Sequence, residues 1–298
     1  MNKYWGMDFR SDIGLSLPLA IQIEITESCN FNCPFCYNDS GIRHEIALPI
    51  EKWKNFLYYL KDLGGVFQCA FSGGEPLLYK NDLLELMDIL HSDKTGLVLI
   101  TNAYFLDHAY IEKLCNYNWY WIQVSLDSYQ PNVHDSLRGV KGSFNRAKKA
   151  IELLKYHRLP VAISSVICNK NISDIDGIVK LACDLHTDIV LFSPVLPVGR
   201  SVANSFLQLD SVQLLNYSQE IEKVMEKYSS QILVRSAQPY DEQMRNNSLN
   251  PPFGILIRPN GDVKIDCLSQ NIVGNVFQTP IDVIWRTIMK EERWKTNE

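Results

Sequence analysis

The stretch LAIQIEITESCNFNCPFCYN (residues 19–38) begins as an apolar, β-branched run and continues into a polar loop that holds three cysteines. The run 19–26 predicts a buried strand. From this strand onward, strand-like and helix-like runs alternate as far as residue 195. Such alternation predicts an α/β fold, with a parallel sheet and helices outside it. Six strands predict a partial (β/α)6 TIM-like barrel, an incomplete version of the eight-unit barrel.

The predicted strands are 19–26, 66–74, 96–102, 119–127, 160–167 and 188–195. The predicted helices between them are 48–64, 81–93, 107–118, 142–158 and 172–186. In parallel sheets the functional residues lie on loops at the carboxyl ends of the strands. The unusual motifs of this chain fall at those ends, namely the cysteines, SGGEP (72–76), TNA (101–103) and SLDS (125–128). We therefore expect them to form one site.

Beyond residue 200 the alternation stops. The sequence there predicts a helix, a polar loop, a hairpin and a closing helix at 210–228, 236–250, 253–267 and 280–294. Asn260 and Gly261 are expected in the hairpin turn. We predict a barrel domain over 17–200 and a small β-hairpin/helix extension over 201–298.

The composition argues against several kinds of partner. A net charge of −5 disfavours nucleic acid or an anionic membrane. The apolar stretches are too short to span a membrane, and no signal-peptide pattern opens the sequence. We therefore expect a cytoplasmic protein. In that reducing setting the eight cysteines should be metal ligands, reactive thiols or small core residues rather than disulfides.

Cys29, Cys33 and Cys36 occupy eight positions of one polar loop. Zinc is one alternative, but zinc usually takes four ligands, and the nearest histidine, His44, lies eight residues past Cys36. Three unconnected core cysteines are a second alternative, which the polar neighbours disfavour. A [4Fe–4S] cluster fits better, because thiolates are its natural ligands. Three thiolates would leave one iron open to an outside ligand.

The spacing Cys29-x3-Cys33-x2-Cys36, with Phe35 before the last cysteine, resembles the signature of the radical S-adenosylmethionine (SAM) superfamily. The resemblance covers about residues 19–200. It implies that SAM binds the open iron of the cluster and that one electron breaks a C–S bond of SAM. The resulting 5′-deoxyadenosyl radical would take a hydrogen atom from a substrate. An electron donor such as flavodoxin or ferredoxin is implied as a partner.

The SGGEP motif, which is Ser72, Gly73, Gly74, Glu75 and Pro76, resembles the Gly-Gly-Glu-Pro motif of this superfamily. The resemblance implies that these residues contact SAM. Glycines let backbone approach a ligand closely, and a carboxylate accepts charge-assisted hydrogen bonds from an ammonium group. From the residues alone, the alternative is a turn before a helix that begins at the proline.

Two further segments resemble parts of the same family. Thr101 and Asn102 stand where the family has Thr-Asn-Gly, although Ala103 replaces the glycine. Leu196, in the segment SPVLPVGR after the sixth strand, is implied to pack beside the adenine of SAM. A proline-rich strand exit is the alternative for that segment.

The segments VSLDS and HDSLRGVKGSF (124–128 and 134–144) resemble the subgroup that includes peptide-modifying maturases. The resemblance implies that Ser125 and Arg138 hold the ribose or the carboxylate of SAM. Arg138 suits a carboxylate because its planar fork can bond both oxygens. Asp127 would pair with Arg138 or position it. A salt-bridged surface turn is the alternative.

The C-terminal hairpin and helix resemble the start of a SPASM or twitch extension, in which further cysteines bind auxiliary clusters. Cys267 is the only cysteine after Cys183, and one thiolate cannot hold a cubane cluster. Cys115, Cys168 and Cys183 are expected on helices or strands, so we predict a single cluster. Cys267 is either a small buried hydrophobe or, as resemblance to radical peptide epimerases implies, a hydrogen-atom donor to a substrate radical.

The resemblance implies an enzyme that modifies a ribosomally synthesised peptide, by crosslinking, epimerisation or a related C–H reaction. A small molecule such as a nucleotide, sugar or amino acid is the alternative substrate. A non-catalytic iron–sulfur redox sensor is an alternative of a different class, although a sensor needs no SAM pocket. Some twenty residues precede the first strand, so we expect a separate protein to bind any leader peptide.

Overall fold

The computed structural model of the protein describes residues 16–41, 50–91, 95–237 and 252–290. Within them, ten strands form one sheet in the order β10-β9-β8-β1-β2-β3-β4-β5-β6-β7. The strands are β1 (Ala20–Glu24), β2 (Gln68–Ser72), β3 (Gly96–Thr101), β4 (Trp119–Ser125), β5 (Val161–Ile167), β6 (Ile189–Pro194), β7 (Leu233–Ser236), β8 (Gly254–Ile257), β9 (Asp262–Lys264) and β10 (Gly274–Asn275).

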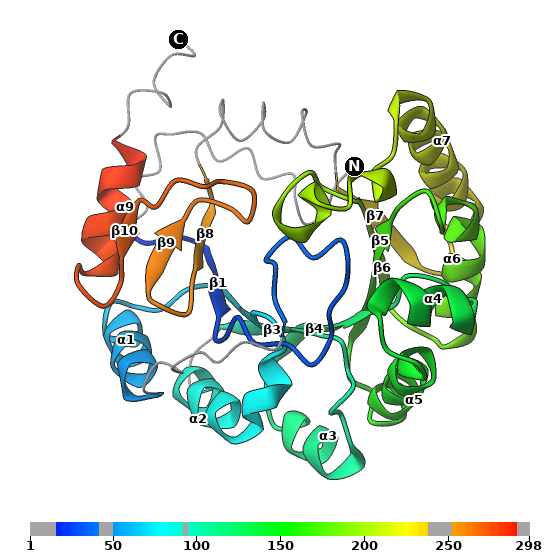
Figure 1. Ribbon diagram of the computed structural model, residues 1–298. Helices are drawn as coiled ribbons and strands as arrows, with labels where there is room; N and C mark the ends of the chain where they lie inside the picture. The colour runs from blue at the N-terminus through cyan, green and yellow to red at the C-terminus, as the bar shows by residue number, and fades with distance from the viewer. Residues whose placement is uncertain (1–15, 42–49, 92–94, 238–251, 291–298) are drawn as a thin grey trace.

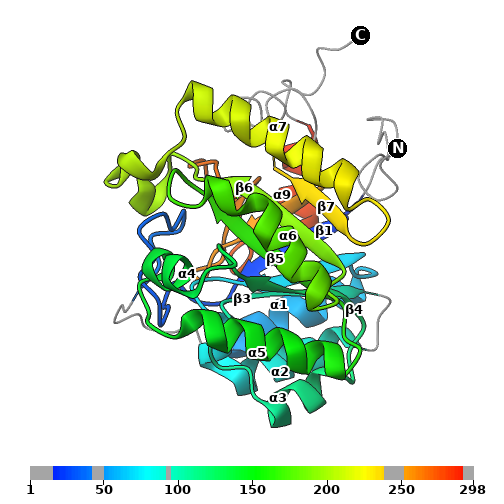
Figure 2. The same ribbon diagram turned by 90° about the vertical axis from the view of Figure 1, so that its right-hand side faces the viewer.

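Helices cover the outer face of this curled sheet (Figure 1). They are α1 (Ile50–Asp62), α2 (Lys80–His91), α3 (His108–Leu114), α4 (Pro131–Arg138), α5 (Ser143–Tyr156), α6 (Ile175–Asp184), α7 (Ser211–Lys227) and α9 (Ile281–Met289). Short 3-10 turns are η1 (Pro76–Tyr79), η2 (Ile172–Asp174), η3 (Gly199–Val202) and η4 (Ser205–Leu207). Figure 2 shows α5, α6 and α7 side by side on that outer face. No helix of the described residues is long and apolar enough to cross a membrane.

Strands β1 to β6 pair in parallel and in sequence order. The predicted α/β fold with a mainly parallel sheet is therefore confirmed. The sequence analysis missed α4, which lies between β4 and α5. This helix is eight residues long, too short for a clear helical period. Its signals are Pro131 in the first turn and Gly139 at the end, with a left-handed φ of 71°.

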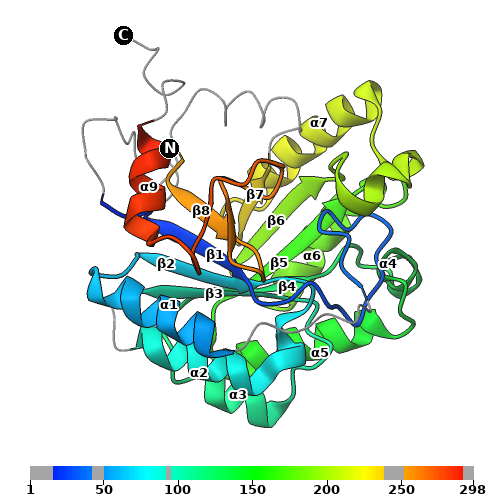
Figure 3. The ribbon, with the colours of Figure 1, turned by 60° about the vertical axis from the view of Figure 1, so that its left-hand side comes forward.

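The sheet continues past residue 200 on both sides of the six predicted strands. β7 pairs in parallel with β6, and β8 pairs in parallel with β1 (Figure 3). The predicted hairpin is confirmed as β8 and β9, with Gly261 in its turn at a φ of 88°. Most of the predicted loop 236–250 lies outside the described residues. Residues 17–200 and 201–298 thus contribute to one sheet, and a domain boundary between them stays a prediction.

Alternation along the strands separates an apolar outer face from a more polar inner face. In β1, Ile21 and Ile23 lie in the main core beneath the helices, while Gln22 donates a hydrogen bond to Ser72 and Glu24 is fully buried. A strand with period-two alternation in an open barrel presents its second set of side chains to the hollow of the barrel. The inner face therefore offers polar groups to a ligand.

Trp53 of α1 is 2% exposed and packs edge-on against Phe56 and Phe277, with ring centroids 6.2 and 5.1 Å away. We expect Trp53→Ala to lower the free energy of unfolding by about 3–5 kcal/mol, because it leaves a cavity in the core. Tyr58→Ala is the control, since this ring lies on the same helix and is 53% exposed. Urea denaturation of both variants measures the difference, and equal losses would contradict the packing described.

Candidate functional site

The three predicted ligand cysteines lie on one loop (residues 29–41, the cysteine loop) that follows β1. Its two ends meet where the Cys29 N–H donates to the Gly41 carbonyl at 2.9 Å. A second apolar cluster, separate from the main core, packs against this loop. Cys33 belongs to that cluster, and Cys29 and Cys36 pack against it. Its other buried members are Phe31, Phe35, Leu137, Cys168, Val195 and Leu207.

The side-chain chemistry of this loop fits a thiolate-bound cluster. As placed, no three His, Cys, Asp or Glu side chains of the described residues form a group that could hold a single metal ion. The donor set still fits, because the three sulfurs share one short loop and one apolar surface. Two sulfurs already accept backbone N–H bonds, Cys29 from Phe31 at 3.3 Å and Cys36 from Ser40 at 3.4 Å. Hydrogen bonds to sulfur are among the features that tune such clusters.

The two glycines of the SGGEP motif lie against the start of the cysteine loop. A Cβ on Gly73 would be 2.4 Å from the Thr26 carbonyl oxygen, and one on Gly74 would be 2.1 Å from the Ser28 carbonyl oxygen. Gly74 also donates its N–H to the Thr26 carbonyl at 2.7 Å. The sequence analysis attributed their small size to a ligand. The structure adds a second reason, the close approach of two segments of the chain, while contact of these glycines with a ligand stays a prediction.

Glu75 is fully buried and holds the ends of β2 and β3 together. Its carboxylate accepts from the Thr101 hydroxyl at 2.7 Å, the Asn102 N–H at 2.7 Å and the Leu77 N–H at 3.0 Å. Burial raises the pKa of Glu75 to about 7. The turn before a helix, which was the alternative for this motif, is present, because Pro76 begins η1 and Glu75 caps it. Contact of the motif with SAM stays a prediction.

Asn102 connects this carboxylate network to the cysteine loop. Its side-chain amide donates to Asn30 Oδ1 at 2.8 Å and approaches Cys29 Sγ at 3.9 Å. Ala103, where the family pattern has glycine, adopts a left-handed φ of 61°. That conformation favours glycine, so the backbone shape of the pattern is kept although the residue differs.

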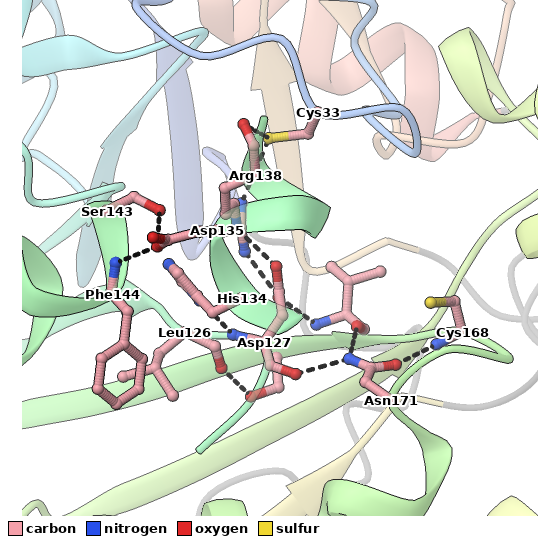
Figure 4. A network of polar contacts seen from close by, with 12 residues as sticks. Cys33, Leu126, Asp127, His134, Asp135, Arg138, Ser143, Phe144, Cys168 and Asn171 are labelled. Atoms are coloured by element: carbon pink, nitrogen blue, oxygen red, sulfur yellow. Dashed lines mark hydrogen bonds and ion pairs between the residues drawn. The ribbon is translucent and has the colours of Figure 1, made fainter. Parts of the chain in front are cut away.

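The predicted pair of Asp127 and Arg138 forms, but inside the protein (Figure 4). Arg138 Nε lies 2.6 Å from Asp127 Oδ2, and Nη2 donates to Oδ1 at 2.8 Å. Asp127 is fully buried and Arg138 is 9% exposed, so the alternative of a surface turn is wrong. From the sequence, the guanidinium of Arg138 was expected to bind a carboxylate of the ligand. In the structure, its Nε and Nη2 bind the Asp127 carboxylate.

Arg138 also contacts the cysteine loop. Its Nη1 lies 3.9 Å from Cys33 Sγ, and the Cys33 thiol donates to the Arg138 carbonyl at 3.8 Å (Figure 4). The guanidinium carbon is 5.5 Å from the centre of the Phe35 ring. A cationic group therefore lies between a buried carboxylate and a predicted ligand thiol.

His134 and Asn171 support Asp127, and the sequence analysis assigned neither a role. His134 Nδ1 accepts the Asp127 N–H at 3.1 Å, and the Asn171 amide donates to the Asp127 carbonyl at 2.6 Å (Figure 4). Burial lowers the pKa of His134 to about 4. The position of His134 four residues before Arg138, on the same helix face, is the only sequence signal for it.

Two predicted residues, Ser125 and Leu196, are not part of these contacts. Ser125 ends β4 in register with Ser164 of β5. Leu196, half-buried after β6, accepts hydrogen bonds through its carbonyl from the Val198 N–H and the Ser201 hydroxyl. The structure therefore brings the cysteines, Glu75, Thr101, Asn102, Asp127 and Arg138 into one connected network.

Cys267 lies elsewhere, in a pocket of about 390 Å³ beside the other half of the cysteine loop. Tyr37 donates its hydroxyl to Glu24 at 2.9 Å, and Arg258 bonds Glu24, Glu27 and Asn38. These residues line the pocket with Cys267. Burial raises the pKa of Cys267 to about 11, so this group is a thiol at neutral pH.

Comparisons with known proteins identify the family. The Radical SAM superfamily profile matches residues 23–182, more than half of the chain. The chain belongs to the radical SAM superfamily, whose members use a [4Fe–4S] cluster and SAM.

Two curated relatives are named as a bacteriocin biosynthesis protein and a peptide cyclase. The antilisterial bacteriocin subtilosin biosynthesis protein AlbA of Bacillus subtilis (strain 168) is 27% identical over 282 residues, which are 94% of this chain and 62% of AlbA. The PqqA peptide cyclase of Bradyrhizobium diazoefficiens is 28% identical over 273 residues, which are 88% of this chain and 70% of the cyclase. The chain thus spans less than two thirds of the length of AlbA.

Among solved structures, Streptococcus suis SuiB bound to SAM has a TM-score of 0.74 at 19% identity, over 91% of this chain and 66% of that chain. Another SuiB structure contains the precursor peptide SuiA. At this identity the likeness supports the fold alone.

The buried neutral His134 makes stability depend on pH. Its pKa is about 4 in the folded protein and ordinarily 6.5, so between these values the unfolded chain binds more protons. The free energy of unfolding should therefore fall as the pH is lowered through this window, by about 3 kcal/mol in full.

In His134→Gln the loss between pH 7.5 and pH 5 should shrink by about 2 kcal/mol. His108→Gln is the matched control, because the His108 side chain is 54% exposed. Urea denaturation at the two pH values measures both variants. A pH dependence that is the same in His134→Gln and in the wild type would show that His134 is not the group responsible.

Proposed function

We propose that this protein is a radical SAM enzyme that cleaves SAM reductively and abstracts a hydrogen atom from a ribosomally synthesised peptide. The observation that supports this most is the connection of three thiols on one loop to two buried networks, centred on Glu75 and on Arg138. A redox sensor needs electron exchange at a cluster but no second ligand site beside it. Two connected polar networks at the strand ends favour an enzyme.

Cys29, Cys33 and Cys36 would hold three irons of one [4Fe–4S] cluster. The cluster and SAM supply, when bound, one-electron cleavage of a C–S bond and a radical that removes hydrogen from carbon. The protein's own part is to hold the thiols in a dry apolar surface, which Phe31 and Phe35 provide. A metal-bound thiol is deprotonated outright, so the raised pKa of Cys29, about 12 in the metal-free protein, does not oppose binding.

We assign the SAM side of the site to the strand ends next to these thiols. Ser72 ends β2 and Gly73 to Pro76 follow it, Thr101 ends β3 and Asn102 follows it, Ser125 ends β4, and Leu196 follows β6. Glu75 and Arg138 would act mainly by positioning, because their charged groups already hold Thr101, Asn102 and Asp127. Buried groups of this kind fix neighbouring backbone within the tolerance that catalysis needs.

A peptide substrate is supported by the names of the relatives and by the pocket beside the cysteine loop. Its lining mixes Glu24, Arg258, Tyr37 and Cys267, which can hydrogen-bond a peptide backbone or a polar side chain. A small molecule is the second candidate, since about 390 Å³ also suits a ligand of that size. A flavodoxin or ferredoxin would supply electrons, a separate protein would bind a leader peptide, and the enzyme would work in the cytoplasm.

The first test uses the cysteines. Anaerobic reconstitution of the wild type should give iron near four per chain, and SAM with dithionite should yield 5′-deoxyadenosine. Any one of Cys29→Ala, Cys33→Ala or Cys36→Ala should abolish that product, whereas Cys115→Ala, an exposed cysteine at the end of α3, should not. Wild-type protein that binds iron but makes no 5′-deoxyadenosine would support a sensor instead, and iron near eight would refute a single cluster.

The second test concerns Cys267 as a hydrogen-atom donor. Its S–H bond would break as a C–H bond forms on the substrate radical, and one electron from the donor protein plus one proton would restore the thiol. A short reading frame beside the gene would supply the peptide to assay. In D₂O the wild-type product should carry solvent deuterium, and Cys267→Ala should lose it. Full product with unchanged deuterium in Cys267→Ala would eliminate this role.

A further inference from the structure

The segment that follows β6 holds the back of the cysteine loop. Residues 199–204 (the loop cradle) lie beside the cysteine loop, although at least 158 residues separate the two in sequence (Figure 3). Gly199 approaches so closely that a Cβ there would lie 2.2 Å from the Tyr37 carbonyl oxygen and 2.5 Å from that of Cys36. Its φ of 60° also favours glycine. The contact is therefore built into the backbone.

Arg200 makes four polar contacts with the cysteine loop. Its backbone N–H donates to the Cys36 carbonyl at 2.9 Å, and Nη1 donates to the Cys33 carbonyl at 2.8 Å. Nε bonds Asp39 Oδ1 at 3.0 Å, and Nη2 donates to the Ser40 carbonyl. Asn204 adds a bond from its amide to the Pro34 carbonyl at 3.1 Å. Four carbonyl oxygens of one short loop are thus held by one adjacent segment.

Two of these carbonyls also define the turns that space the thiols. The Cys33 carbonyl accepts the Cys36 N–H, and the Cys36 carbonyl accepts the Asp39 N–H, each at 3.2 Å. Arg200 bonds both carbonyls as a second donor, so it stabilises two consecutive turns at the residues that carry sulfur. A lysine would keep the backbone bond to the Cys36 carbonyl, but its ammonium is a compact point charge without the planar fork that reaches Cys33, Asp39 and Ser40 at once.

We propose that Arg200 is a positioning residue for the predicted cluster and fixes the cysteine loop in its ligand-binding shape before iron is bound. The proposal rests on the proposed function in one respect, namely that the three cysteines are cluster ligands. The Arg200 guanidinium acts on the cluster indirectly, because it contacts backbone carbonyls of the loop. A preformed loop needs less ordering when the cluster assembles, which lowers the entropic cost of binding.

The test is hydrogen exchange of the metal-free protein, followed by mass spectrometry of peptides from residues 29–41. Arg200→Met should speed exchange of the Cys36 amide about tenfold, because its acceptor, the Cys33 carbonyl, loses the charge-assisted bond from Nη1. The Asp39 amide should change less, because the backbone N–H of residue 200 still bonds its acceptor, the Cys36 carbonyl. Arg200→Lys should have the same effect, because the positive charge it keeps cannot replace the several donors of the guanidinium group. Exchange in α1 and α5 should stay unchanged, and the rate of iron uptake during anaerobic reconstitution should fall in both variants.

Two further variants make the result decisive. Arg286→Met is the control, because Arg286 pairs with Asp282 within α9 and has a 60% exposed side chain. Asn204→Asp removes the amide donations to the Pro34 and Arg200 carbonyls and keeps the Arg200 side chain, so it should give a smaller increase in loop exchange. It decides the matter if Arg200→Met fails to fold. Loop exchange at the wild-type rate, or faster exchange spread evenly over the chain, would overturn the proposal. If the wild type takes up no iron, the proposed function fails while the exchange result still stands.

Discussion

The candidate site depends on one buried carboxylate that has no access to water. Glu75 is fully buried, and a buried carboxylate is tolerated only where hydrogen bonds replace its hydration. Its donors come from the end of β3 and from η1. The need to satisfy this one group therefore aligns two strand ends. Asn102, placed in this way, reaches the cysteine loop, so the constraint extends to the predicted ligands.

Three arginines hold the cysteine loop from different sides. Arg138 contacts Cys33 next to a buried aspartate, Arg200 bonds carbonyls along the back of the loop, and Arg258 reaches Asn38 from the C-terminal hairpin. A loop without regular structure leaves many carbonyls to satisfy. Arginine suits this task because it is always charged and carries several donors in a rigid plane. These contacts hold the loop from outside, in addition to the turns that its own Cys36 and Asp39 amides form.

The strands of the fold could be predicted because their signal is local. Apolar, β-branched runs such as 19–26 and 160–167 announced β1 and β5, and the motifs at the strand ends followed from the rule for parallel sheets. Strand β7 has only four residues and, unlike the equally short β8, no Asn-Gly turn beside it, so it was missed. The pairing of β7 with β6 joins segments about 40 residues apart, and the pattern of apolar residues along the chain does not indicate it.

In the candidate site, only residues that belong to a recognisable sequence motif could be predicted. Cys33 and Arg138 were identified, but the occupation of the Arg138 fork by Asp127 depends on burial, which spacing does not reveal. Arg200 was missed because its partner Asp39 is 161 residues away. Gly73 and Gly74 were identified for their approach to a ligand, but their close packing on Thr26 and Ser28 was missed, since these residues lie far back in the chain.

The pairing of β8 with β1 has a consequence for how the protein is made. β1 can pair with β2 once the first 72 residues exist, but its other neighbour ends at Ile257. Contacts between such distant segments form late, because the chain must first close a long loop. During synthesis this edge of β1 therefore stays unpaired until Ile257 has emerged from the ribosome. A chain released before that point would keep an open strand edge, which can pair with another chain.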